Sequence, residues 1–218
     1  MSTIEPTPRT TVRRLRERGD YERETIYSIL DEAFICHAAC YADGTVWMIP
    51  TAYGRDGDHL YLHGAAANHV LKAAAAGAPL TVTVTLTDAL VLARSTFHHS
   101  INYRSVTIFG TATSVDDPVE KAAALEKIVE HMLPGRTLEA RAPNPTELTA
   151  TRVVSLPIEE ASAKMRTGGP KDDDSDLELP VWAGLLPLRL TAGLPVDDVQ
   201  HPSTVPVSPS LSQPGRWG

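Results

Sequence analysis

Two stretches of the chain combine residue types that could bind a ligand or move a proton. The first runs from His63-Gly64 to Asn68-His69, where an expected strand ends in a turn and opens a helix. Backbone N–H groups at a helix start, with a glycine that allows close approach, suit a phosphate or another anion. Strand-to-helix turns without a ligand look similar, so both interpretations stay open at this point.

The second stretch covers residues 97–106 and places many hydrogen-bond donors just before a long expected strand. It includes His98, His99, Tyr103, Arg104 and Ser105. This mixture is typical of a ligand site, but a polar network between structural elements would use the same side chains. A site and a structural network are therefore alternatives here.

Fingerprints of several common catalytic classes are absent from the sequence. There is no Gly-x-Gly-x-x-Gly, Gly-x-x-x-x-Gly-Lys, Gly-x-Ser-x-Gly or His-Glu-x-x-His, which disfavours nucleotide-dependent kinases and serine hydrolases. The eight histidines also lack zinc-ligand spacing. His59 and His63 share a strand face but lie too far apart to hold one small ion together. We therefore predict no metal site of this kind.

Cys36 and Cys40 lie on one expected strand, about 13 Å apart at ~3.3 Å per residue. A disulfide needs Cα atoms within about 7 Å, so we predict two free thiols that act as small buried hydrophobic residues. No stretch approaches the ~20 apolar residues of a membrane span, and the Arg-rich N-terminus has no apolar segment behind it. These features predict a cytoplasmic protein.

The composition is that of an ordinary globular protein. Of the 218 residues, 42% are apolar and 22% are charged, which is enough to form a buried core. Lys and Arg number 20 against 27 Asp and Glu, so the formal charge is 20 − 27 = −7. A net negative surface disfavours nucleic acid and anionic membranes as partners.

Periodicity and turn residues predict a mainly β fold with a few helices. Strands are expected over residues 34–41, 46–53 and 59–63, joined by turns at Asp43-Gly44 and residues 55–58 as a meander. A helix is expected from Asp20, with Ile26, Ile29 and Leu30 at helical spacing, and another over 70–76. A third is expected from Pro118, where Asp117 opens a sequence that resembles a capping box, and residues 144–147 are expected to start a short one. Further strands are expected over 80–86, 91–94, 105–115, 151–156 and 161–165, and an edge strand over 181–190.

The remaining segments set the domain boundaries. Residues 1–19 are predicted as a flexible Arg-rich arm, residues 20–191 as one domain, and residues 192–218 as a Pro/Ser-rich tail. Within the domain, the acidic residues 168–178 are expected to form a solvated loop. Many short antiparallel strands with two or three helices predict a β-barrel decorated by helices, of the α+β type.

An ordered set of motifs resembles a known family. The motifs are IPTAY (49–53), LYLHG (60–64), NYRSV (102–106) with FG (109–110), and WAGLLPL (182–188). Together they resemble the pyridoxamine 5′-phosphate oxidase-like family, in its flavin-nucleotide-binding and nitroimidazole-resistance branch. The resemblance implies an FMN-binding split β-barrel that forms a homodimer, with two flavins at the subunit interface.

The resemblance also implies a set of site residues. The strand from Met48 to Thr51 would lie along the isoalloxazine ring, and the turn after His63 would reach the ring edge and the phosphate. Trp182 would close the site from the partner chain. The implied cofactor-binding residues are Met48, Ile49, Pro50, Thr51, His63, Gly64, Asn68, His69, Arg104, Ser105 and Trp182.

One departure from the family pattern widens the choice of cofactor. The family commonly has Ser followed by Arg or Lys at the start of the phosphate-side helix, whereas this chain has Ala67-Asn68-His69. A hydroxyl and a permanent cation are both replaced. Relatives on this fold use FMN, FAD, the deazaflavin F420 or haem, and a haem ligand is available among His63, His98 and His99.

Three functional hypotheses follow. The first is an FMN-dependent oxidoreductase for a small organic substrate, with His63 and Tyr103 as candidate catalytic proton donors. The second is a haem-binding enzyme on the same split barrel, with an axial histidine. The third is a non-catalytic flavin or F420 carrier or sensor whose N-terminal arm and C-terminal tail bind a partner.

Overall fold

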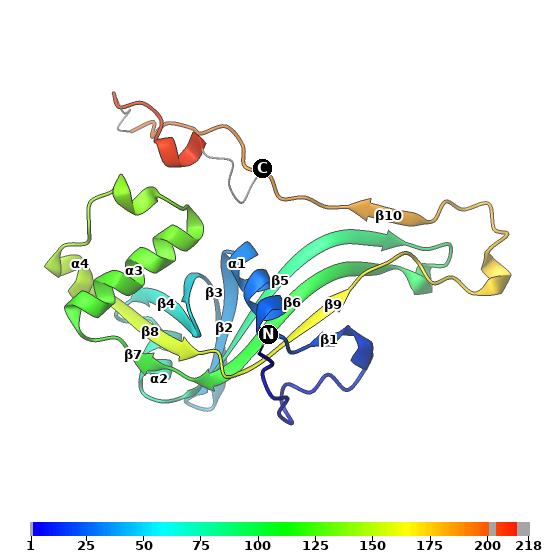
Figure 1. Cartoon of the computed structure of the whole chain (residues 1–218), viewed down its shortest axis with the longest axis horizontal. Helices are drawn as coiled ribbons and strands as arrows, with labels where there is room; N and C mark the ends of the chain where they lie inside the picture. Colours follow the sequence, from blue (N-terminus) through cyan, green and yellow to red (C-terminus); the bar gives the residue numbers. More distant parts are fainter. Residues whose placement is uncertain (1, 201–203, 213–218) are drawn as a thin grey trace.

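An antiparallel sheet forms the framework of the molecule, shown in Figure 1 as a computed structural model that describes residues 2–200 and 204–212. The strands are β1 (Gly19–Asp20), β2 (Ile35–Ala42), β3 (Thr45–Asp56), β4 (His59–Ala65), β5 (Pro79–Leu92), β6 (Ser100–Thr111), β7 (Thr113–Ser114), β8 (Thr151–Pro157), β9 (Glu160–Arg166) and β10 (Gly184–Pro187). They lie in the order β1-β9-β6-β5-β2-β3-β4-β8-β7, and β10 pairs with β5. This mainly antiparallel architecture confirms the predicted split-barrel fold class.

In the described part of the chain, four α-helices accompany the sheet: α1 (Arg23–Glu32), α2 (His69–Ala75), α3 (Pro118–Met132) and α4 (Pro145–Ala150). Helix α1 buries Ile26, Ile29 and Leu30, the three residues whose spacing predicted it. It begins three residues after the predicted start, because Asp20 instead accepts the backbone N–H of Glu22. The long helix α3 begins as predicted, with the Asp117 side chain accepting the N–H groups of residues 119 and 120.

The predicted meander of three strands is confirmed. Strand β2 pairs with β3 and β3 pairs with β4, both antiparallel. The turn between β2 and β3 has positive φ at both Asp43 (52°) and Gly44 (77°). A two-residue hairpin turn of type I′ requires this conformation, and Asp-Gly adopts it readily. The local turn chemistry therefore sets the register of the hairpin.

Two strand predictions were wrong in their boundaries. Residues 80–86 and 91–94 were expected as separate strands, but they form one strand, β5, whose register shifts between Thr87 and Ala89. The first part of β5 pairs with β2, and residues 89–92 pair with β10. Residues 105–115 were expected as one strand but divide into β6 and β7, because β7 leaves β6 and pairs with β8. The chain therefore passes here from the part of the sheet that contains β6 and β9 to the part that contains β8.

The main core lies between α1, α2 and the inner faces of the strands. Cys36 and Cys40 are buried there as free thiols, as predicted. Burial raises the pKa of Cys36 to about 12, so this thiol stays protonated and unreactive. A smaller cluster of Val115, Ala124 and Val153 lies under α3.

The acidic segment 168–178 was predicted as a solvated loop, and this is wrong for Asp172. Its side chain is only 2% exposed and accepts hydrogen bonds from the backbone N–H and the guanidinium of Arg94, each at 2.8 Å. Burial by itself raises the pKa of Asp172, but the hydrogen bonds from Arg94 outweigh it and hold the pKa below its ordinary value. The segment is therefore tied to the end of β5.

This ion pair makes stability depend on pH. A lowered folded-state pKa contributes stability above the unfolded value of about 3.9, and that contribution is lost as the pH falls. We expect the wild-type protein to lose thermal stability more steeply between about pH 5 and pH 3 than the Asp172→Asn variant. Thermal unfolding followed across this range compares the two proteins directly. Parallel curves would contradict the assignment.

The described N-terminal and C-terminal segments lie on different parts of the molecule (Figure 1). Residues 2–18, within the predicted arm, fold beside β1 and β9, and a bridge joins Thr3 to Glu22. After β10 the chain runs back toward α3, where Ser210 donates hydrogen bonds to Glu139. The rest of the predicted tail, at 201–203 and 213–218, lies outside the described residues. Among residues 2–200 and 204–212 we find no helix with the length and apolar composition that a membrane crossing requires.

Candidate functional site

The strand register assembles one continuous outer face from four neighbouring strands. Residues directly opposite in antiparallel strands share a face. Met48 lies opposite Ala39, and Pro50 lies opposite His37. His37 in turn lies opposite Thr83 of β5, which lies opposite Thr107 of β6. We call this surface the outer sheet face, and its polar and apolar members are His37, Met48, Pro50, Thr83, Ser105 and Thr107.

The hairpin end of the outer sheet face is apolar and exposed. Met48 is 62% exposed, and Tyr41 and Val46, which pair with each other, are exposed beside it. Toward β5 and β6 the face becomes rich in hydroxyl groups, and the Thr83 and Thr107 hydroxyls lie 3.2 Å apart. An apolar strip that borders hydrogen-bonding groups suits a flat ligand with polar edges.

Along β6, Val106 points into the core, and Tyr103 and Ser105 point to the opposite side. They therefore share the outer sheet face. Tyr103 lies opposite Thr87 and Arg166, and Ser105 lies opposite Thr85 and Lys164. Of the predicted site residues, Met48, Pro50, Tyr103 and Ser105 therefore share one face, with β2 and β5 between β3 and β6.

Arg104 points to the opposite side from Ser105. Its guanidinium binds Glu32 at the end of α1 and Asp88 at the irregularity of β5, with 2.7 Å between Nη2 and an oxygen of each carboxylate. These hydrogen bonds, in which Arg104 donates, raise its pKa further above the ordinary value, and Glu32 contributes more than Asp88. Two carboxylates already compensate its charge, so it is poorly suited to neutralise a phosphate.

Arg104 lines a groove of about 810 Å³ between α1, β5 and the segment that follows β10. Leu188 and Leu190 form the apolar wall of this groove, with Phe34 and Leu86 across from them. Ile49 and Thr51 also alternate away from Met48 and Pro50 on β3. The predicted site residues therefore divide between two sides of the sheet.

His63 lies on the side of the sheet that α3 covers. It pairs with Val153 of β8, a member of the small cluster under α3. Burial lowers the pKa of His63, and its Nδ1 is buried with no hydrogen-bond partner in the described part of the chain. The imidazole is therefore neutral near pH 7. Gly64 follows it, with Leu71 packed against its Cα.

The turn into α2 uses its polar groups internally. The Asn68 side chain accepts the N–H of Leu71 at 3.1 Å, and the N–H of Asn68 donates to Ala65 at 2.8 Å. His69 packs its ring on Trp47, with the ring centres 4.4 Å apart, and its Nε2 lies 3.5 Å from the Asp43 carboxylate. Asn68 acts here as a helix cap.

The histidines of the 97–106 stretch have different partners. His98 Nε2 lies 3.3 Å from the Asp173 carboxylate. His99 Nδ1 lies 3.0 Å from the carbonyl oxygen of Ser95, and the His99 side chain is exposed. Because a carbonyl can only accept, Nδ1 carries the proton and Nε2 of His99 offers its lone pair to solvent.

The surroundings of two predicted site residues, Trp182 and Arg104, depend on parts of the chain that local sequence does not connect. Trp182 is exposed and packs over Gly184 at the start of β10. Sequence reasoning missed Glu32 and Asp88 as partners of Arg104, because no local pattern connects residues that far apart. It also missed Lys164, which the alternation of buried and half-buried residues along β9 could have placed on the outer sheet face.

Similarity to known proteins identifies the family of this chain. The model of the pyridoxamine 5′-phosphate oxidase family matches residues 22–165. No curated protein sequence matches the chain. Among solved structures, the chain is similar to the flavocytochrome Anf3 from Azotobacter vinelandii, with 37% identity and a TM-score of 0.88 over 95% of this chain and 96% of that one.

Two further structures are similar. The FAD and heme binding protein from Mycobacterium smegmatis is 36% identical, with a TM-score of 0.84 over 89% of this chain and 96% of that one. A protein described as a 5-nitroimidazole antibiotic resistance protein, from Bacteroides thetaiotaomicron, is 21% identical, with a TM-score of 0.55 over 67% of this chain and 85% of that one, and shares the fold. The chain belongs to the pyridoxamine 5′-phosphate oxidase family.

Proposed function

We propose that this chain is a redox protein that binds both a flavin and a haem. The observation that carries the proposal is its similarity, at 37% and 36% identity over nearly the whole chain, to a flavocytochrome and to an FAD and heme binding protein. Similarity at this level extends beyond the family core, since it includes the segments before residue 22 and after residue 165. The proposal joins two of the hypotheses drawn from the sequence.

The outer sheet face supports the flavin part of the proposal. Its apolar hairpin residues Met48 and Pro50 suit the flat ring, and the hydroxyls of β5 and β6 suit its polar edge and side chain. A bound flavin would supply hydride and electron transfer, while the protein orients it and controls access. Tyr103 shares this face and is the better placed of the two predicted proton donors, since His63 lies under α3.

We favour FAD over FMN as the flavin. One relative is described as binding FAD. In this chain the turn into α2, where the family pattern places a hydroxyl and a cation for the FMN phosphate, carries Ala67, Asn68 and His69 instead. The Asn68 side chain caps α2, and the N–H groups of Ala66 and Asn68 donate to backbone carbonyls. A mononucleotide phosphate would therefore lack both the hydroxyl and the permanent cation at this turn.

His99 fits a haem ligand best among the three predicted candidates. Metal-ligating histidines usually donate their second ring N–H to a carbonyl or carboxylate, which orients the ring. His99 does so through Ser95 and leaves Nε2 exposed. Phe97, two residues away, is 86% exposed and offers an apolar surface beside it. His98 also has an orienting carboxylate, that of Asp173, but its side chain is only 23% exposed, and the buried Nδ1 of His63 has no partner in the described residues.

We also propose a homodimer. Within the described part of the chain, residues 45–52 of β3 have a neighbouring strand, β2, on one side only. Large apolar side chains are exposed beside this open edge and along β10, and such a surface is typical of an interface. They are Tyr41, Val46, Trp47, Met48, Leu185 and Leu186.

The visible absorption spectrum of freshly purified protein tests the function. We expect flavin bands together with a haem Soret band, and FAD as the flavin that denaturation releases and mass spectrometry identifies. Release of FMN would support the flavin assignment but contradict the choice of FAD. A protein that remains colourless after incubation with FAD, FMN and haemin would overturn the proposal.

A further inference from the structure

The N-terminal segment, residues 2–18, is folded onto the barrel instead of extending from it. Ile4 is 2% exposed within the main core, and Thr10 is equally buried. The backbone N–H of Ile4 donates to the Tyr21 carbonyl, and the N–H of Val12 donates to the Tyr21 hydroxyl, each at 2.9 Å. These contacts hold both ends of the stretch from residue 4 to residue 12.

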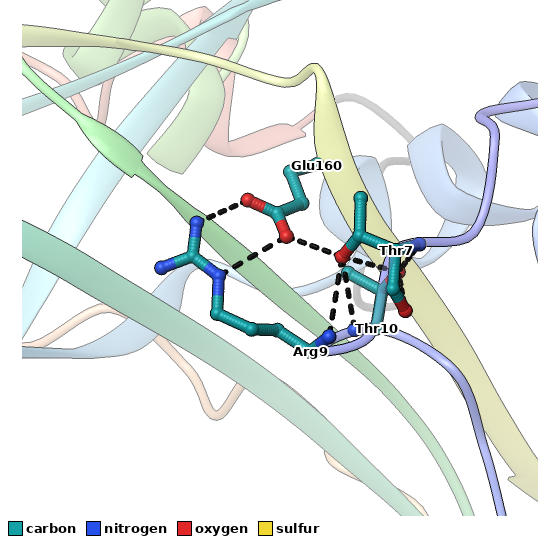
Figure 2. Close-up of polar contacts among 4 residues, drawn as sticks. All are labelled: Thr7, Arg9, Thr10 and Glu160. Atoms are coloured by element: carbon teal, nitrogen blue, oxygen red, sulfur yellow. Dashed lines mark hydrogen bonds and ion pairs between the residues drawn. The ribbon is translucent and has the colours of Figure 1, made fainter.

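Glu160 anchors the middle of this segment to β9, as Figure 2 shows. The Thr7 hydroxyl and the Arg9 guanidinium both donate to its carboxylate, with Arg9 Nε 3.1 Å from one oxygen. These hydrogen bonds, from Arg9 first and Thr7 second, lower the pKa of Glu160. The Arg9 guanidinium also lies over the Phe109 ring, 5.1 Å from its centre. The segment is thus held across β6 and β9, next to the outer sheet face.

A hollow of about 290 Å³ lies between the segment and these strands, and we call it the arm pocket. Its lining contains cations and hydroxyl groups, and no carboxylate is among the residues that line it. Such a lining offers an anion both charged and neutral hydrogen-bond donors, and it holds no carboxylate that would repel the anion. The side chains that matter are those of Arg9, Arg13, Ser105, Thr107, Ser162 and Lys164.

Two of these cations are uncompensated. Arg9 is paired with Glu160, but Arg13 and Lys164 form no salt bridge within residues 2–200 and 204–212. Positive charge accumulates further along β9, where burial and then the charge of Arg18 lower the pKa of Arg166. This concentration of cations stands out in a chain whose formal charge is −7. An anionic ligand would relieve the repulsion.

The arm pocket is continuous with the outer sheet face, since Ser105 and Thr107 belong to both. We propose that the arm pocket binds the phosphate or diphosphate group of a ligand through Arg13 and Lys164. Resting on the proposed function, the ligand is the flavin dinucleotide, whose ring lies toward Met48 and Pro50. A separate phosphorylated substrate would use the same chemistry, and the experiment distinguishes the two sources.

The test compares three full-length proteins: the wild type, the double variant Arg13→Gln/Lys164→Gln, and the control Arg14→Gln/Arg16→Gln. The control also removes two positive charges, both from the N-terminal segment, at exposed residues outside the arm pocket. Thermal unfolding first establishes that all three proteins are equally folded. Each apoprotein is then titrated with FAD and with riboflavin, and calorimetry measures pyrophosphate binding to the apoprotein and to the FAD-loaded protein.

We expect the Arg13→Gln/Lys164→Gln protein to bind FAD at least about tenfold more weakly, since each lost charged donor costs roughly that factor. Riboflavin affinity and the control protein should be unchanged. Unchanged FAD affinity with pyrophosphate binding to the FAD-loaded wild type, lost in the double variant, would instead assign the arm pocket to a separate phosphorylated ligand.

The outcome also separates the arm pocket from the proposed function. If the wild type takes up no flavin but binds pyrophosphate through Arg13 and Lys164, the flavin assignment fails and the arm pocket stands. If the double variant matches the wild type and the control with every probe, the arm pocket proposal is overturned.

Discussion

The His99→Ala variant is expected to lose the haem Soret band while it retains its flavin. His99 is the exposed histidine whose Nδ1 proton is committed to a carbonyl, that of Ser95, at 3.0 Å. That hydrogen bond fixes the tautomer and the ring orientation, so Nε2 would bind a haem iron without the entropy cost of ordering the ring. Loss of an axial ligand should reduce haem content by at least about tenfold, because even outer-sphere changes cost 10- to 100-fold.

His98→Ala and His63→Ala are the matched controls. His98 lies against the Asp173 carboxylate, and His63 is half-buried under α3, so neither should change the Soret band. Haem content is measured from the Soret absorbance relative to protein, and flavin is measured after release. An unchanged Soret band in His99→Ala would show that the axial ligand is another group. A colourless wild type would remove the haem proposal itself.

A second large effect is expected from Gly54→Ala, because α3 packs directly on the backbone of β3. A Cβ atom at residue 54 would lie 2.7 Å from the backbone nitrogen of Ile128 and 2.8 Å from the carbonyl oxygen of Lys127. Both obstacles are helix backbone, so a rotamer change cannot relieve the contact, and α3 must shift away from the sheet. Overpacking of this kind costs about 1–3 kcal/mol in the free energy of unfolding.

Gly169→Ala provides the comparison for this effect. No atom lies within 4 Å of the Cβ position at Gly169, and its φ is not positive, so the added methyl group meets neither steric contact nor backbone strain. Its effect should stay within about 0.5 kcal/mol. Urea denaturation of the wild type and both variants measures the difference. Equal midpoints for Gly54→Ala and the wild type would contradict the close packing of α3 on β3.

Local chemistry let the sequence predict most elements of the fold. The Asp43-Gly44 hairpin and the Asp117 helix cap each depend on a few neighbouring residues, and both occur as predicted. The spacing of Ile26, Ile29 and Leu30 likewise predicted the buried face of α1. Short motifs in the right order were enough to recognise the family. In each case, turn geometry or periodicity is set within a few residues of chain.

The boundaries of β5 depended on distant partners. In the sequence, the residues around Asp88 look like the end of one strand and the start of another. In the structure, β10 pairs with residues 89–92 and the strand is continuous. Asp172 was expected in solvent because its neighbours are acidic, yet it is buried against Arg94, 78 residues away. Composition predicts average exposure, but an individual side chain can still find a buried ion partner.

The candidate sites likewise depend partly on local sequence and partly on contacts between distant residues. The sequence determined the family and the mainly β fold, because these follow from local patterns and ordered motifs. Only the tertiary structure decided that Arg104 binds Glu32 and Asp88 while Ser105 lines the arm pocket, and that Arg9 reaches Glu160, 151 residues away. Alternation assigns side chains to two faces of a strand, but strand register and the path of the chain decide what lies opposite each face.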